Sequence, residues 1–186
     1  KRLKDSTMKL VVEKGFGGAS AANIALDANV AAGYFYMHYK GKYEMVNSLL
    51  QEVFQEAVFK LEEYLEGGHT FDQVVDQIID HIFTIANTDP VKLKFLYVLS
   101  NDYSFVIDKE IRQKVQGFLS KLIELGKSTE SIDTKITDND LYLLLLVNTI
   151  QYINLRFKYK PEDMEISVEV KNHLRYLLKK VLKQNR

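Results

Sequence analysis

The sequence predicts an all-α protein with a small N-terminal head of three helices, a long connecting helix and a larger helical body. Two observations predict this fold class. Only 2 prolines and 9 glycines interrupt the 186 residues, and so few breaks favour long helices over a fold with many turns. Apolar side chains recur at helical spacing, whereas two-residue alternation never lasts long enough to indicate a strand.

Three short helices are expected in the head. The first covers residues 3–14, where apolar side chains form the stripe of a core-facing helix and glycines follow. Ser20 is a suitable N-cap for a second helix over residues 21–28. Asn29 tolerates the left-handed conformation that a sharp turn between helices needs. A third short helix is then expected over residues 32–39.

A long fourth helix is expected from Lys42 to the glycine pair Gly67-Gly68. Its length of about 25 residues corresponds to about 37 Å, which is enough to join the head to a separate body. Helical spacing continues beyond the glycines and predicts a body of further helices. They are expected at Thr70–Asn87, Val91–Tyr103, Asp108–Ser128, Asp138–Lys158 and Ile166–Gln184.

Charge is balanced over the whole chain but not along it. The totals are 25 basic and 25 acidic side chains, yet residues 1–50 hold seven Lys or Arg against four Asp or Glu. A basic N-terminal unit therefore precedes a mildly acidic body, which is compatible with a polyanionic partner. No uncharged apolar stretch approaches about 18 residues, and no signal-peptide core follows the basic start. We therefore expect a cytoplasmic protein without a membrane partner.

Residues 20–42 have the layout of a helix-turn-helix. Ala25 lies four residues before the turn residue Asn29, so that two helices can cross closely, and the apolar Val30 follows the turn. A short second helix then carries polar and aromatic side chains outward. Small helix pairs without a DNA-binding role also show this pattern, so the pattern alone leaves the function open.

A longer stretch, residues 3–50, resembles the DNA-binding head of the TetR family of bacterial transcription regulators. The segments that carry the resemblance are Val12–Phe16, Asn23–Ala25, Ala28–Val30, Gly33–Tyr39 and Lys42. The resemblance implies a helix-turn-helix DNA-binding domain at residues 1–44 and a ligand-binding and dimerisation domain at residues 45–186. It implies a ligand-responsive transcriptional regulator, which we expect to be a repressor that binds a palindromic double-stranded DNA operator as a homodimer.

The resemblance also implies roles for single residues of the head. Phe35 falls where the family buries an apolar side chain in the core of the head. Lys42 opens the fourth helix, where its charge and the free backbone N–H groups suit a phosphate. Polar groups that the family often has at residues 31 and 32 are replaced here by alanines, which reduces hydrogen bonding to bases. The residues expected at the DNA are Ala32, Tyr34, Tyr36, Met37, His38, Lys40 and Lys42.

Two other interpretations of these residues stay open. The aromatic side chains of residues 34–39 could pack on one another as a cluster, and Lys42 could be an ordinary surface lysine at a helix end. Because Ala31 and Ala32 lack polar groups, the chain could also be a helical ligand- or partner-binding module. Such a module would retain the head but bind DNA weakly or not at all.

The body is dense in aromatic residues at helical spacing, and core packing explains most of them. The resemblance implies a small-molecule effector, which we expect to be largely apolar because the interior of a helical bundle is where such pockets form. Two of the candidates, Asn148 and Tyr152, lie in a largely apolar helix, where an amide could anchor a ligand or be satisfied in an interface. The candidate ligand-binding residues are Phe83, Tyr97, Tyr103, Phe118, Asn148 and Tyr152.

The last two helices are expected to form the homodimer interface. Residues 141–155 are apolar nearly all round, and such a helix must be covered on both sides. The final helix can pair with it, and two such hairpins related by a twofold axis make a four-helix interface. The alternative is one helix buried inside a monomer.

Enzymatic and metal-dependent functions find little support. The chain has no cysteine, which excludes disulfides, thiolate zinc sites and cysteine nucleophiles. No glycine-rich phosphate loop or nucleophile elbow is present. Asp72, Asp76 and Asp80 fall on one helix face, where we expect them to be solvated. We therefore expect no enzymatic activity, no cofactor and no metal site.

Overall fold

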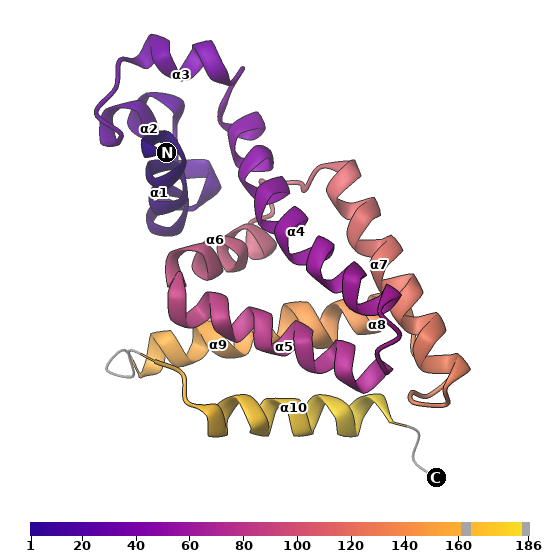
Figure 1. Ribbon diagram of the computed structural model, residues 1–186. Helices are drawn as coiled ribbons and strands as arrows, with labels where there is room; N and C mark the ends of the chain where they lie inside the picture. Colours follow the sequence, from indigo (N-terminus) through magenta and orange to yellow (C-terminus); the bar gives the residue numbers. More distant parts are fainter. Residues whose placement is uncertain (161–164, 184–186) are drawn as a thin grey trace.

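The computed structural model describes residues 1–160 and 165–183, except for the side chains of residues 56–61. All regular structure in these residues is helical, which confirms the predicted all-α class (Figure 1). In order along this part of the chain, the elements are α1 (Arg2–Gly18), α2 (Ala21–Asp27), α3 (Ala32–His38), α4 (Lys42–Glu66), α5 (Phe71–Thr88), α6 (Pro90–Asn101), α7 (Lys109–Ser128), α8 (Asp138–Leu141), the π-helical segment η1 (Tyr142–Val147), α9 (Asn148–Tyr159) and α10 (Val168–Leu182).

Local signals account for the boundaries in the head, which consists of α1, α2 and α3. The helical backbone of α1 is interrupted at Gly15 (φ 71°, ψ 170°), one residue after the predicted end at Lys14. The Ser20 Oγ accepts the Asn23 N–H at 3.1 Å and so caps α2 as predicted. Asn29 adopts the left-handed conformation, with φ 54°, in the turn between α2 and α3.

One apolar core joins the head to the body. Leu10, Val11, Ile24 and Phe35 are buried in the head, and Phe95 of α6 belongs to the same cluster. Figure 1 shows α6 beside α1, and these two helices pack closely against each other. The head is therefore attached to the body through α1 as well as through the connecting helix α4.

The connecting helix α4 spans 25 residues and ends at the predicted glycine pair. The Gly67 N–H donates to the Glu63 carbonyl at 2.9 Å, and Gly68 has φ 74°, which favours glycine. Near its start, Met45 and Val46 are buried in the core of the head. Farther along, α4 packs against α5 and α7 and thereby enters the body (Figure 1).

In the body, α5 lies between several other helices. A capping box begins it, because the Thr70 N–H donates to the Gln73 Oε1 at 2.8 Å and the Gln73 N–H donates to the Thr70 Oγ1 at 3.3 Å. Its buried face contributes Val75, Ile78 and Ile79 to a core shared with α7, η1, α9 and α10. This arrangement makes α5 a central support of the body.

The predicted helix over residues 138–158 is one continuous helical path, but its middle is wound more widely. Residues 142–147 form the π-helical segment η1 between α8 and α9. The sequence of η1, YLLLLV, is apolar throughout and carries no breaker residue that would reveal the change in winding. Single π-helical turns inside α-helices occur often at functional sites.

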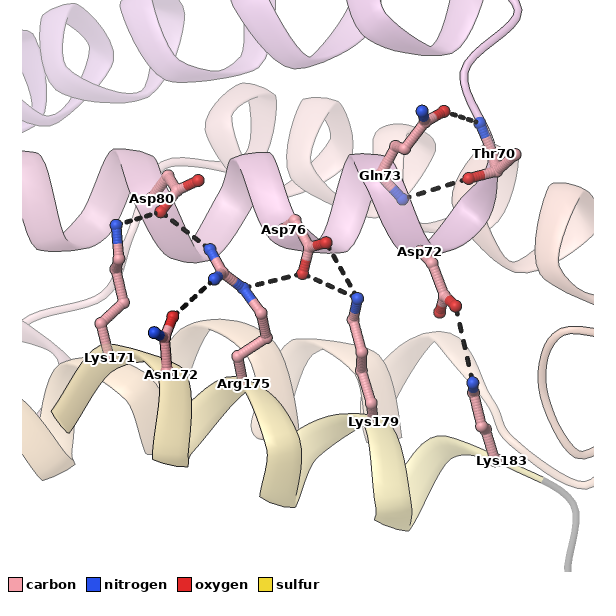
Figure 2. Close-up of polar contacts among 10 residues, drawn as sticks. All are labelled: Thr70, Asp72, Gln73, Asp76, Asp80, Lys171, Asn172, Arg175, Lys179 and Lys183. Carbon is pink, nitrogen blue, oxygen red and sulfur yellow. Dashed lines mark hydrogen bonds and ion pairs between the residues drawn. The ribbon is translucent and has the colours of Figure 1, made fainter. Parts of the chain in front are cut away.

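The last helix, α10, is held on α5 by a ladder of ion pairs (Figure 2). The carboxylates come from α5 and are spaced four residues apart, which places them on one face. The pairs join Lys171 and Arg175 to Asp80, Arg175 and Lys179 to Asp76, and Lys183 to Asp72. The expected solvated acidic face of α5 is therefore wrong, because α10 covers it.

This ladder also defines where α10 packs. Leu174, Leu178 and Leu182 of α10 are buried in the core of the body, and the helix contacts mainly α5 rather than α9. The expected pairing of the last two helices with each other is thus replaced by pairing of α10 with α5. The predicted end of this helix, Gln184, lies outside the described residues.

Candidate nucleic-acid interface and effector cavity

The helix-turn-helix is built as its spacing predicts. Ala25 of α2 is buried at the crossing with α3, and its carbonyl accepts the Val30 N–H at 3.0 Å, which closes the turn. Phe35 is completely buried and fixes α3 against the head. Because one face of this seven-residue helix is anchored by Phe35, its remaining side chains point outward.

The outward face of α3 carries the predicted DNA-contacting side chains. Tyr34 is 46% exposed, Tyr36 61% and Met37 79%, and His38 is also exposed. The Tyr34 ring meets the His38 ring edge-on at 4.7 Å, so these two side chains support each other on the surface. The alternative of an aromatic cluster is met in part, because the Phe35 ring contacts the Tyr36 and Tyr39 rings, yet Phe35 is the aromatic residue of α3 that is buried.

The beginning of α3 lacks a side-chain cap. Ala31 occupies the N-cap position and has no side chain able to accept a hydrogen bond from the first turn. Ala32 is exposed beside it and offers only a methyl group. This end of α3 therefore provides apolar contact and backbone N–H groups rather than polar side chains.

Lys42 has a different environment from the one expected of a phosphate contact. Its ammonium donates to the Phe16 carbonyl at 2.7 Å and to the Gly17 carbonyl at 3.2 Å. It also lies 4.4 Å from the centre of the Phe16 ring, in the geometry of a cation–π contact. Lys42 therefore holds the part of α1 that follows the kink at Gly15, and its expected phosphate contact stays a prediction. Lys40 is exposed, and its backbone N–H donates to the Glu44 Oε2 at 2.5 Å.

A basic groove beside α3 was not identified from the sequence. The groove encloses about 460 Å³ and is lined by Lys1 and Arg2 from the start of α1 together with Tyr34 and His38 from α3. Lys4 also borders it, but this lysine is paired with Glu52 of α4. The basic cluster in the first four residues was visible in the sequence, whereas its position next to α3 depends on the tertiary fold.

The body contains an apolar cavity with a volume of about 100 Å³. Its walls come from α4, α5, α6, α7, η1 and α9, and they include the aliphatic side chains of Val53, Ile78 and Leu99. The polar residues in the wall are His81, Ser100 and Tyr142. Burial raises the pKa of the Tyr142 phenol, which keeps it neutral and able to donate a hydrogen bond.

A second, more polar cavity of about 260 Å³ adjoins the first. The two share several lining residues, among them Phe54 and Tyr142, so they form neighbouring compartments. Arg112, Gln116, Asp138 and Asn139 border the second cavity and bring a cation, a carboxylate and two amides to it. The pair of compartments suits a molecule with an apolar chain and a polar end.

The structure places the six candidate ligand residues at different sites. Phe118 lies in the wall of the apolar cavity, whereas Phe83 is buried in the neighbouring core. Tyr103 is fully exposed in the connection after α6, so it is corrected to a surface residue. The other three, Tyr97, Asn148 and Tyr152, do not border either cavity, and Asn148 is exposed.

The sequence does not reveal the wall of the apolar cavity, because most of its side chains are aliphatic. Ile78, Ile82 and Leu99 recur at the same helical spacing as ordinary core residues, so the sequence has no signal that separates them. Among the side chains that the structure describes, no group of His, Asp or Glu is arranged to hold a metal ion. Across the same part of the chain, no helix is both long and apolar enough to cross a membrane.

Comparisons with known proteins agree with this geometry. Residues 3–49 match the family described as bacterial regulatory proteins, tetR family. The chain is 24% identical to the HTH-type transcriptional regulator YvdT of Bacillus subtilis over 170 residues, which cover 89% of this chain and 87% of that protein. It is also 24% identical to the fatty acid metabolism regulator protein of Bacillus subtilis over 143 residues, with 71% and 72% covered.

A solved structure shares the whole fold. The transcriptional regulator FadR from Bacillus subtilis, in complex with stearoyl-CoA, superposes with a TM-score of 0.70 at 17% identity. The match covers 97% of this chain and 98% of that one. The similarity therefore extends from the head through the body.

Proposed function

The chain belongs to the TetR family of transcriptional regulators, and from that premise we propose a homodimeric repressor that an apolar effector releases from its operator. Membership of this family confirms the expected helix-turn-helix regulator and the expected lack of enzymatic activity.

The outward face of α3 is the observation that best supports DNA binding. Tyr34, Tyr36, Met37 and His38 stand on the accessible side of a helix whose other side is anchored by Phe35. In a helix-turn-helix protein this helix enters the major groove, where aromatic and apolar side chains can contact thymine methyl groups. Ala32 would add a further apolar contact at the start of the helix. An operator binder of this kind acts where bacterial DNA is, in the cytoplasm.

Phosphate contacts are assigned to the groove between α1 and α3 as well as to Lys40. Lys1 and Arg2 border the groove next to Tyr34 and His38, so cations lie directly beside the helix that reads the bases. Phosphate contacts fix the register of a protein on DNA, whereas base contacts provide specificity. Because the Lys42 ammonium already donates to the Phe16 and Gly17 carbonyls of α1, these exposed cations are proposed as the main phosphate contacts.

The homodimer is proposed to form through the surface of the last two helices. Leu143 of η1 is 49% exposed, and Tyr176, Leu177 and Val181 of α10 are 58%, 42% and 57% exposed. Large apolar side chains that are exposed on these helices suit a protein–protein contact. A second copy related by a twofold axis would cover them and bring two heads to adjacent half-sites, about one helical turn of DNA apart.

The effector is proposed to be a long-chain acyl compound, with an acyl-CoA as the first candidate. The apolar cavity offers aliphatic walls for a chain, and Arg112 in the adjoining cavity offers a cation for a polar, anionic end. The similarity to a fatty acid metabolism regulator and to a stearoyl-CoA complex supports this class. By linkage, such an effector releases DNA only if it binds the DNA-free state more tightly.

A selection of genomic fragments at several salt concentrations tests the proposal. Retained duplexes should share an inverted repeat, and their affinity should fall steeply as salt rises, because phosphate contacts release counterions. Stearoyl-CoA should lower the retention of those duplexes. Failure to retain any duplex at low salt, or retention that ignores sequence, would contradict operator binding.

The uncapped, alanine-rich start of α3 favours a second candidate function. With Ala31 and Ala32 exposed and without polar groups, base recognition at this end rests on apolar contacts. A ligand-binding module that retains the head but has little affinity for DNA would fit this feature. Calorimetric binding of stearoyl-CoA without any recoverable operator would support that function over a repressor.

A further inference from the structure

Asp102, which directly follows α6, binds the head at the kink of α1. The Asp102 Oδ2 accepts the Phe16 N–H at 2.9 Å, across 86 positions of sequence. The other oxygen, Oδ1, accepts the Ser104 N–H at 2.9 Å and the Ser104 hydroxyl at 2.6 Å. The amide of Phe16 follows directly on Gly15, whose φ of 71° creates the kink in α1. The carboxylate therefore binds the turn at which α1 leads toward the helix-turn-helix.

Aromatic and backbone contacts reinforce this attachment. The Phe105 ring lies 4.9 Å from the Phe16 ring and 5.7 Å from the Tyr43 ring. The Tyr43 hydroxyl donates to the Val106 carbonyl at 2.8 Å. The connection between α6 and α7, residues 102–108, is thus joined to α1 and to the start of α4.

The same connection is flanked by residues of the cavity wall. Leu99 and Ser100 precede Asp102 in α6, and Ile107 follows it, and all three of these flanking residues line the apolar cavity. A displacement of the wall at either end would therefore move the carboxylate that holds Phe16.

The size of the cavity requires such a displacement. A cavity of about 150 Å³ accommodates one benzene ring, whereas the cavity here measures about 100 Å³. A long acyl chain cannot enter unless the walls separate. The wall formed by the end of α6 is a candidate to move, because it leads into a connection rather than into a continuous helix.

We infer that Asp102 is a positioning residue that links the cavity wall to the orientation of the head. With the cavity closed, its carboxylate holds the Phe16 turn and fixes the head on α6. An effector that enlarges the cavity moves the end of α6, withdraws the carboxylate and releases the head. This inference rests on the proposed effector-dependent function and identifies the contact through which the effector would act.

Hydrogen exchange of the Phe16 amide, followed by NMR, tests the link in the full chain. In the wild type, saturating stearoyl-CoA should accelerate this exchange about tenfold, the scale of one lost hydrogen bond to a charged acceptor, and should leave the Val11 amide unchanged. D102A should exchange rapidly with or without the ligand. D102N keeps the shape of the side chain and provides the second variant should D102A fail to fold. S104A removes a hydroxyl that contacts only the other carboxylate oxygen and should retain the response.

DNA binding provides the second measurement. D102A should bind stearoyl-CoA within about twofold of the wild type, yet the ligand should no longer change its affinity for the selected duplex by more than about threefold. A D102A protein whose duplex affinity responds to the ligand as the wild type does would overturn the inference. So would a Phe16 amide that stays protected in the ligand-bound wild type.

A variant that fills the cavity separates this inference from the proposed function. If stearoyl-CoA does not bind the wild type, the proposed ligand class fails. The V147W variant then tests the link without a ligand, because the larger side chain at position 147 of η1 fills the cavity. Acceleration of Phe16 exchange in V147W, or in the milder V147F, would support the link. Unchanged exchange in a folded variant would overturn it. If no duplex is recovered, operator binding fails while these exchange measurements still decide the inference.

Discussion

The candidate DNA-binding residues and the cavity wall are assembled in different ways. The side chains proposed to contact bases all lie on α3, a single element of seven residues, 32–38. The cavity wall draws on positions as distant as Leu50 and Ile150. A surface on one helix follows from that helix's own periodicity, whereas a cavity is what remains after several helices have packed. The proposed DNA-reading surface is therefore encoded locally in the sequence, and the proposed effector site is not.

Removal of the Phe35 ring should give the largest effect. Phe35→Ala empties a fully buried site and should lower the free energy of unfolding by about 3–5 kcal/mol. Its exposed neighbour provides the matched control, since Tyr36→Ala should change stability by less than about 0.5 kcal/mol while weakening operator binding. Urea denaturation followed by circular dichroism measures the stability of both variants.

The same experiment tests how independent the head is. Because one core joins α1 to α6, we expect a single unfolding transition in which head and body lose structure together. A separate early transition in Phe35→Ala would show instead that the head unfolds on its own, and would sharpen the contrast between the two regions.

Two cations at the head should behave differently. Lys42→Ala removes hydrogen bonds to the Phe16 and Gly17 carbonyls and should cost about 1–2 kcal/mol of stability. Arg2→Ala should leave stability nearly unchanged but reduce the slope of log affinity against log salt by about one. Lys9→Ala is a useful control, because Lys9 is paired with Asp27 and lies outside the basic groove. Equal salt slopes for Arg2→Ala and Lys9→Ala would contradict the proposed phosphate contact.

Helix boundaries were predictable because the signals that define them are local. Ser20, Asn29 and the glycine pair after α4 each act within a few residues, and each appears where it was expected. Phe35 and the outward residues of α3 followed from the family resemblance in the same short stretch.

Several features that the sequence does not reveal depend on distant contacts. Asp102 lies in a connection and meets Phe16 only through the tertiary fold. The face of Asp76 and Asp80 has the spacing of a solvated surface, and only the position of α10 reveals its partners. Lys42 shows the same limit within the head. The family resemblance gives its place at the start of α4 but does not reveal that its ammonium donates to the Phe16 carbonyl.

The ion-pair ladder should contribute a smaller stabilisation to the body. Asp76→Ala removes the carboxylate of Lys179 and one of the two carboxylates that Arg175 contacts, since Arg175 keeps Asp80. Because these groups are partly exposed, we expect a loss of about 1 kcal/mol. Asp72→Ala is the matched control, since its contact with Lys183 is longer, at 3.6 Å, and more exposed. Its effect should be close to zero. Thermal unfolding in low and high salt measures the difference, which should shrink as salt screens the pairs. Equal losses in both variants would contradict this ranking of the contacts.

The smallest effect concerns pH and the contact between the two regions. Hydrogen bonds from the Ser104 hydroxyl and N–H, followed by those from the Phe16 and Gly17 backbone, hold the pKa of Asp102 below its ordinary value of 3.8. A depressed pKa in the folded state means that the contact stabilises the protein above pH 3.8 and is lost as pH falls through the lower, folded value. Lys42 and Tyr43 at the start of α4 contact the Phe16 ring beside this hydrogen bond. Phe16 amide exchange should therefore accelerate on acidification below pH 3.8 in the wild type but not in D102N, beyond the change shared by other amides. In S104A the acceleration should begin at higher pH, since the hydrogen bond that most lowers the pKa of Asp102 is gone. Identical pH profiles of Phe16 exchange in wild type and D102N would show that this carboxylate does not hold the head.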